Sequence, residues 1–253
     1  MSAMLDPRQR KTVTEMTARL RQALGDRLRA VVLHGPAARG EHVDEGELHL
    51  LVVVTDLELT TLGALAGPMA YARKRGLPVP RIFSPALLAS SGDVFPIELL
   101  ELGHHREVLT GTDPIGEVAI DLEHLRVQCE REITEKLMRL REAYAESGGR
   151  PRHLRRLMIA SFPELGHVLA GALRVLGQPV PARSLEVARA FCRAARIDEQ
   201  AFVEVDAVRH GEAAAPVAEV FARYYAALGA AAEFIDGLEV ATATGSPRKG
   251  AVS

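Results

Sequence analysis

Two polar side chains, Glu47 and His49, open an otherwise apolar stretch of the chain. The stretch Glu-Leu-His-Leu-Leu-Val-Val-Val ends at Val54 and predicts a buried strand, because it is short, apolar and rich in β-branched residues. Side chains two residues apart project from the same face of a strand, so Glu47 and His49 would share a face. A carboxylate is an oxygen ligand of the kind that Mg²⁺ prefers, whereas an imidazole nitrogen suits Zn²⁺ or Ni²⁺ better. The pair indicates a binding or catalytic site, and the alternative is a strand end that emerges into solvent.

A glycine-containing turn precedes this strand. Residues 33–41 are Leu-His-Gly-Pro-Ala-Ala-Arg-Gly-Glu, and they follow a short apolar run that predicts another strand. Ten residues then separate Pro36 from Glu47. We therefore expect a strand, a turn at Gly35, a polar loop and a second strand, with the turn beside the polar pair.

This arrangement resembles the nucleotidyltransferase superfamily, which has the DNA polymerase β-like fold. In that family an apolar residue, a glycine and then a serine or second glycine precede Asp-x-Asp in an apolar strand. Gly35 matches the glycine, Ala-Arg-Gly-Glu at 38–41 matches a sequence that often follows it, and Glu-Leu-His at 47–49 stands where Asp-x-Asp is expected. Weaker similarity covers 95–101 and 106–111. A helical region after the catalytic domain is typical of small-substrate members such as the aminoglycoside-modifying enzymes.

The resemblance implies phosphoryl chemistry. In the family, two divalent metals held by three carboxylates neutralise the charge that develops during nucleotidyl transfer. By this resemblance the catalytic residues would be three carboxylates and one imidazole: Glu47, His49, Glu98 and Glu101. The resemblance also implies that Gly35, Pro36 and Arg39 bind the nucleotide and that Glu47 and Glu98 bind the metal.

Three departures from the family pattern change what the site can do. Pro36 replaces the serine or glycine, which removes both a hydroxyl and a backbone N–H from the phosphate-binding turn. Glu47 keeps the negative charge of the first aspartate on a longer side chain. His49 replaces the second aspartate, which bridges both metals in the family, with a ring that offers one nitrogen. Two-metal Mg²⁺ catalysis through His49 is therefore physically implausible.

The third carboxylate is sought further along the chain. Residues 94–102 predict a strand, with Pro96 near its start as an edge position requires. Residues three apart on a strand face opposite sides, so only one of Glu98 and Glu101 would point at the site. We favour Glu98.

These departures favour a nucleotidyltransferase-like protein with impaired or lost catalysis, acting as a nucleotide- or ligand-binding or regulatory module. The alternative is an active enzyme that uses ATP and Mg²⁺ or Mn²⁺ to move a nucleotidyl group, AMP, to a small-molecule or protein acceptor. A third hypothesis is an unrelated α/β sensor with a helical dimerisation domain.

The elements that must position these residues predict an α+β protein. We expect a polymerase β-like nucleotidyltransferase domain with a mixed sheet at 1–119, an all-helical bundle at 120–240 and a disordered tail at 241–253. In the first part, we expect helices at 7–24 and 57–76 and strands at 28–33, 47–54, 81–83 and 94–102, with a loop or short strand at 109–113. In the second part, we expect helices at 122–146, 152–176, 184–195, 198–209 and 215–236, with an interruption or offset near Pro163.

Composition excludes several classes of function. The 253 residues carry a net charge of −2, so the basic excess of a general nucleic-acid binder is missing. Two cysteines are too few for a disulfide framework or a cysteine zinc site. The charged N-terminal segment does not look like a signal peptide, and no apolar run is long enough to span a bilayer. We expect a cytoplasmic protein without membrane association.

Two further groups of residues invite a functional interpretation. His104 and His105, together with His34 and His49, suggest a histidine metal site, although solvated loop histidines explain them more simply. Basic residues also gather at a predicted helix start: Arg150, Arg152, His153, Arg155 and Arg156. They predict either a solvated helix face or a site for an anionic ligand.

Overall fold

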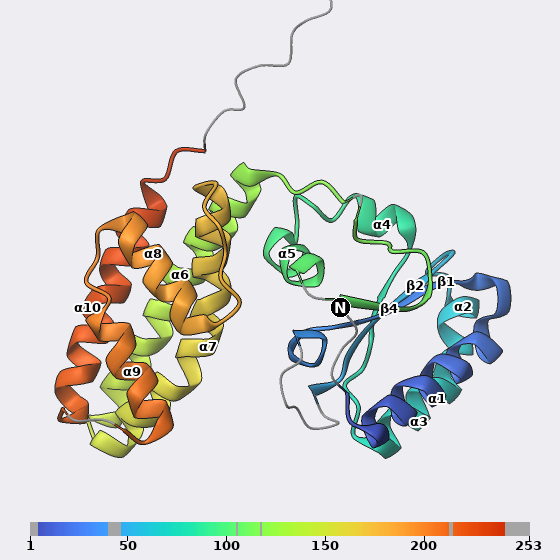
Figure 1. The fold of residues 1–253 in the computed structure, drawn as a ribbon, viewed down its shortest axis with the longest axis horizontal. Coiled ribbons are helices and arrows are strands. Elements are labelled where there is room, and N and C mark those ends of the chain that lie inside the picture. The colour runs from blue at the N-terminus through green and yellow to red at the C-terminus, as the bar shows by residue number, and fades with distance from the viewer. Residues whose placement is uncertain (1–4, 40–46, 105, 117, 213–214, 241–253) are drawn as a thin grey trace, which may run out of the picture. The chain divides into compact units, whose positions relative to one another are not determined.

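The computed structural model describes residues 5–39, 47–104, 106–116, 118–212 and 215–240 (Figure 1). The predicted tail at 241–253 lies outside the described residues. The chain divides into two compact units, and the boundary in the sequence falls between Asp121 and Leu122. Each unit has its own hydrophobic core and is described separately below.

The first unit is built on a four-stranded mixed sheet. Its strands are β1 (Leu28–His34), β2 (His49–Val54), β3 (Arg81–Phe83) and β4 (Arg106–Gly111), in the order β3-β2-β1-β4. Strand β1 is antiparallel to both β2 and β4, whereas β2 and β3 are parallel. The α+β class and the mixed sheet predicted from the sequence are confirmed.

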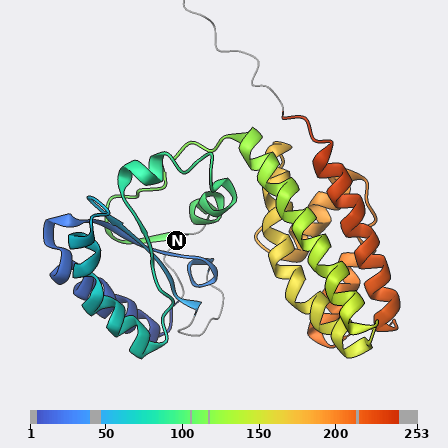
Figure 2. The ribbon, with the colours of Figure 1, turned by 180° about the vertical axis from the view of Figure 1, so that it is seen from behind.

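Helices cover both faces of this sheet (Figures 1 and 2). One face packs on α1 (Pro7–Leu24), α2 (Leu59–Ala64) and α3 (Ala66–Arg75), where Met16 and Leu20 of α1 are fully buried against Leu33 of β1. Val32 and Leu51 point to the other face and pack with Leu88 of α4 (Pro85–Ala89) and with α5 (Pro96–His104). Neighbouring residues alternate between two cores, so the buried residues Ala30–Leu33 of β1 and Leu50–Val54 of β2 are all apolar, as in strands covered on both faces.

The interpretation of residues 94–102 as a strand is wrong, because Pro96–His104 form the helix α5. Pro96 stands at the start of the helix, where its missing N–H costs nothing. Leu99 and Leu102 are buried three residues apart on the side that faces the sheet. A short apolar run does not distinguish a strand from a buried helix, and here the tertiary packing decides.

Other boundaries differ by less. The predicted helix at 57–76 is divided into α2 and α3, and β2 begins at His49, so that Glu47 lies in a turn before the strand. Strand β4 begins three residues earlier than the predicted segment. In the second unit α7 runs without a break through Pro163.

The second unit consists of helices α6 (Leu122–Ser147), α7 (Pro151–Val175), α8 (Ser184–Ala195), α9 (Gln200–His210) and α10 (Val217–Asp236). Aromatic side chains contribute to its core: Phe202 meets Tyr224 edge to face, with ring centroids 6.0 Å apart, and Phe162 is also buried. The Tyr224 hydroxyl lies 3.1 Å from Ser161 Oγ, which satisfies a polar atom inside this core. None of the described helices is both long enough and apolar enough to cross a membrane.

Candidate functional site

The end of β1 turns sharply at Gly35, as the glycine motif predicts. Gly35 has a φ of 76°, in the left-handed region that glycine adopts without strain. A Cβ at this position would lie 3.3 Å from Cδ2 of His49, so the backbone of the turn packs directly on the imidazole. The turn continues as a 3-10 segment at Pro36–Arg39. Glycine is therefore required here both by conformation and by the closeness of the histidine ring.

His34 and His49 face each other across the antiparallel pair of β1 and β2. They occupy the same register position, and their ring centroids are 5.7 Å apart with the planes tilted by 31°. Both rings project to the sheet face that α4 and α5 cover, because Val32 and Leu51, two residues away on each strand, pack there. Within this partly buried pair, His49 stands where the resemblance leads one to expect the second aspartate.

The half-buried His34 ring has one nitrogen that is hydrogen-bonded and one without a partner among the described residues. A hydrogen bond to the Leu50 backbone favours its charged form, whereas its Nε2 is buried without a hydrogen-bond partner among the described residues. The bond to Leu50 therefore involves the other nitrogen, Nδ1. In the neutral ring, Nδ1–H donates to the backbone and Nε2 is left as an acceptor. A ligand with an O–H or N–H group could fill that acceptor.

The electrostatic surroundings keep both rings neutral. Burial lowers the pKa of His34 most, and His49 and Arg81 add to the effect, bringing the pKa to about 4. The pKa of His49 is lowered first by burial and then by Arg81. Arg81 is the first residue of β3 and pairs with Leu51, which places its positive charge beside the histidine pair. Near neutral pH the site therefore consists of an uncharged imidazole at His34 next to an arginine.

Two carboxylates interact with this pair. Glu47 is exposed in the turn before β2, and its negative charge partly offsets the lowering of the His49 pKa. Glu101 of α5 does the same for the pKa of His34. Glu98 is half-buried on the same helix. The expectation that Glu98 and Glu101 face opposite sides is wrong, because residues three apart on a helix lie on one side of it.

Several residues of the motif fall outside what can be described. The backbones of Pro36 and Arg39 belong to the 3-10 turn, but their side chains are not among the described ones. His105 and the side chain of His104 are not described either. Their predicted roles stay predictions.

The donor set does not suit the two-magnesium centre that the fold family uses. Among the described residues, no three histidine, cysteine, aspartate or glutamate side chains are grouped so that they could hold a metal ion. Mg²⁺ prefers oxygen ligands, and here two imidazoles stand at the strand ends. Arg81 adds a positive charge that opposes binding of a cation at the same place.

Arg81 is the residue of this group that sequence analysis missed. It lies far from the glycine turn in sequence, in a strand predicted only from its hydrophobic pattern. Only the parallel pairing of β2 with β3 brings it beside His34 and His49. A basic residue at the start of a short predicted strand was the one available signal, and it carries little information without the strand order.

Comparison with known proteins identifies the fold but no sequence relatives. No protein-family model matches the chain, and no curated protein matches its sequence. Among solved structures, the chain is similar to spectinomycin adenyltransferase AAD(9) from Enterococcus faecialis, solved with ATP and spectinomycin. The match covers 87% of this chain and 99% of that one, with a TM-score of 0.50 and 10% sequence identity. The resemblance inferred from Gly35 and the following strand is thereby confirmed at the level of architecture: this chain has a nucleotidyltransferase fold.

Proposed function

We propose that this protein binds a nucleotide at the His34–His49 end of β1 and β2 and has lost two-metal nucleotidyl transfer. The observation that carries the proposal is that His49 stands where the resemblance leads one to expect the second aspartate of the metal-binding pair, with His34 and Arg81 beside it. The loss of that carboxylate weakens a divalent-cation site, and Arg81 offers a positive charge to an anionic group, although Glu47 and Glu101 also interact with the pair. Its role would be that of a binding or regulatory module.

The chemistry of the three side chains supports a nucleotide. Arginine binds phosphate through charge-assisted hydrogen bonds, so Arg81 offers a direct partner for a phosphate group that a metal would otherwise neutralise. The free Nε2 of His34 is an acceptor and suits a hydroxyl or amino group of the same ligand. A nucleotide carries both kinds of group. ATP is also the nucleotide in the structure of the spectinomycin adenyltransferase, which makes it the first ligand to test.

Thermal denaturation of the full chain with ATP tests the proposal. We expect ATP to raise the melting temperature in EDTA as much as in Mg²⁺, because Arg81 rather than a metal receives the phosphates. Arg81→Gln should remove the shift. Arg73→Gln is the matched control, since Arg73 is an exposed arginine of α3 in the same unit. Absence of any shift with ATP, or equal losses in the two variants, would contradict nucleotide binding at this site.

A second pair of measurements tests the loss of catalysis. We expect no transfer of label from ATP to small-molecule or protein acceptors with Mg²⁺ or Mn²⁺. His49→Asp should restore an anionic oxygen ligand and make ATP binding depend on Mg²⁺. Label transfer that disappears in Glu47→Gln would refute the proposal and favour the active enzyme, with Glu47 and Glu101 as its carboxylates.

A further inference from the structure

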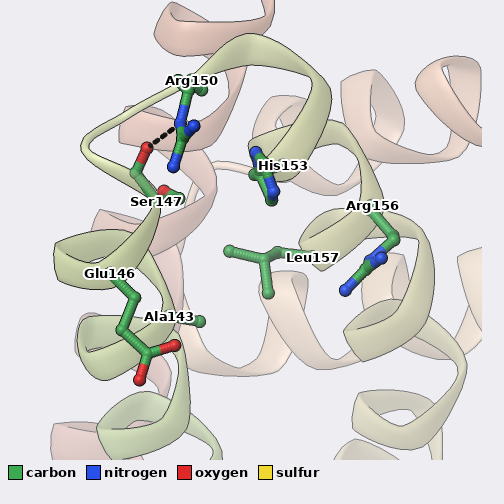
Figure 3. A pocket seen from close by; sticks show the side chains of 7 residues that line it. All are labelled: Ala143, Glu146, Ser147, Arg150, His153, Arg156 and Leu157. Atoms are coloured by element: carbon green, nitrogen blue, oxygen red, sulfur yellow. Dashed lines mark hydrogen bonds between the residues drawn. The ribbon is translucent and has the colours of Figure 1, made fainter.

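A surface pocket lies in the helical unit, between the end of α6 and the first turns of α7. Its volume is about 260 Å³, and seven residues line it: Ala143, Glu146, Ser147, Arg150, His153, Arg156 and Leu157 (Figure 3). Pockets for drug-sized ligands measure roughly 300–1,000 Å³, so this one suits a smaller molecule or a single functional group.

The basic side chains of the pocket form no ion pair with a described carboxylate. Figure 3 shows His153, Arg156 and Leu157 on α7, with the Leu157 side chain directed towards the α6 side of the pocket. No described carboxylate lies within salt-bridge distance of Arg150, His153 or Arg156. Several other arginines of the described helical unit form ion pairs with glutamate or aspartate: Arg126, Arg131, Arg139, Arg189, Arg193, Arg209 and Arg223. The pocket thus brings together three basic side chains that are not paired with any described carboxylate, although Glu146 is also part of its lining.

The turn between α6 and α7 holds Arg150 in place. Nε of Arg150 donates to the Ser147 carbonyl at 2.8 Å, which leaves the two terminal amino groups of the guanidinium available. Gly148 and Gly149 have φ values of 57° and 72°, and the Gly149 N–H donates to Ser147 Oγ. The guanidinium is therefore anchored through one nitrogen by a turn that is itself hydrogen-bonded.

We propose that this pocket binds a phosphate group, either as free phosphate or as the phosphate of a small monoester. Two guanidinium groups can each donate several hydrogen bonds to phosphate oxygens, and His153 adds a ring nitrogen. Leu157 and Ala143 give the pocket an apolar part against which the remainder of an ester can pack. Glu146 is the one acidic residue of the lining, and it opposes the binding of an anion.

Calorimetric titration of the full chain with inorganic phosphate, at constant ionic strength, tests this site. Arg156→Gln should weaken phosphate binding at least tenfold, which corresponds to about 1.4 kcal/mol. Arg152→Gln is the matched control: it removes the same charge from an equally exposed position of the same helix, but Arg152 does not line the pocket. We expect it to change the affinity by less than about twofold, because a charge outside the pocket is screened by solvent. Glu146→Gln should strengthen binding.

A parallel titration with AMP distinguishes the two sources of phosphate. Tighter binding of AMP than of phosphate, lost in Arg156→Gln, assigns the pocket to a monoester, and equal or weaker binding assigns it to free phosphate. The nucleotide proposal is tested by variants at Arg81 and this one by variants at Arg156, so the failure of one proposal is distinguishable from the failure of the other. Equal weakening by Arg156→Gln and Arg152→Gln, weaker binding in Glu146→Gln, or no binding of either probe would overturn the proposal.

Discussion

The low pKa of His34 makes the stability of the sheet unit depend on pH. The unfolded chain binds a proton on this ring below its ordinary pKa of 6.5, whereas the folded chain does so only below about 4. Between these values the unfolded state holds more protons, so stability falls as the pH falls through this window. At about 1.4 kcal/mol per pH unit, acidification from pH 7 to pH 5 costs about 2 kcal/mol through His34.

The contribution of His34 is isolated by comparison with His34→Phe, which keeps an aromatic ring and cannot titrate. Urea denaturation followed through amide NMR signals of β1 and β2 measures the unfolding of the sheet unit separately from that of the helices. We expect the wild-type free energy of unfolding to fall by about 2 kcal/mol more than that of the variant between pH 7 and pH 5. A direct titration of the His34 ring by NMR checks the same point without a variant. Equal losses in both proteins, or a ring that titrates near 6.5, would refute the reasoning.

Two other predictions concern stability. Gly111→Ala should destabilise the sheet unit by about 3 kcal/mol or more, because a Cβ would lie 1.8 Å from the Arg29 carbonyl oxygen and φ is 81°. Gly63→Ala is the control: this glycine lies in a helix, and a Cβ there would have nothing within 4 Å. The control should be neutral or stabilising by up to about 1 kcal/mol. Urea denaturation compares the two variants, and similar losses would contradict this account. Asp6→Ala should cost about 1 kcal/mol, because the Asp6 side chain caps α1 by accepting from the Gln9 N–H at 2.8 Å. A loss below about 0.3 kcal/mol in the same assay would show that the capping box contributes little.

The parts of the fold that the sequence predicts well are those with a strong local pattern. The valine run before Thr55 and the apolar run before Gly35 are β2 and β1, and the long amphipathic stripe around Ile133 is α6. Residues 94–102 were misassigned because their apolar residues fit either period over so short a length. Packing of Leu99 and Leu102 against the sheet, which no local pattern contains, selects the helix.

The candidate site likewise contains some residues that the sequence predicts and others that it does not. Gly35 and His49 were found because a motif with fixed spacing connects them, and the pairing of β1 with β2 brings them into contact. The significance of His34 depends on its register opposite His49, and that of Arg81 on the position of β3 in the sheet. Register and strand order are properties of the folded chain, so a single sequence does not reveal them.

The strand order also has a consequence for how the chain is made. Strand β1 is the first strand to be synthesised, yet one of its edges pairs with β4, the last. Until the residues from Arg106 to Gly111 have left the ribosome, the nascent chain carries an apolar strand with one row of unsatisfied backbone groups. Such edges recruit other chains during synthesis. Fragments that stop before β4 should therefore aggregate, and the shortest useful fragment of the first unit must extend beyond Gly111.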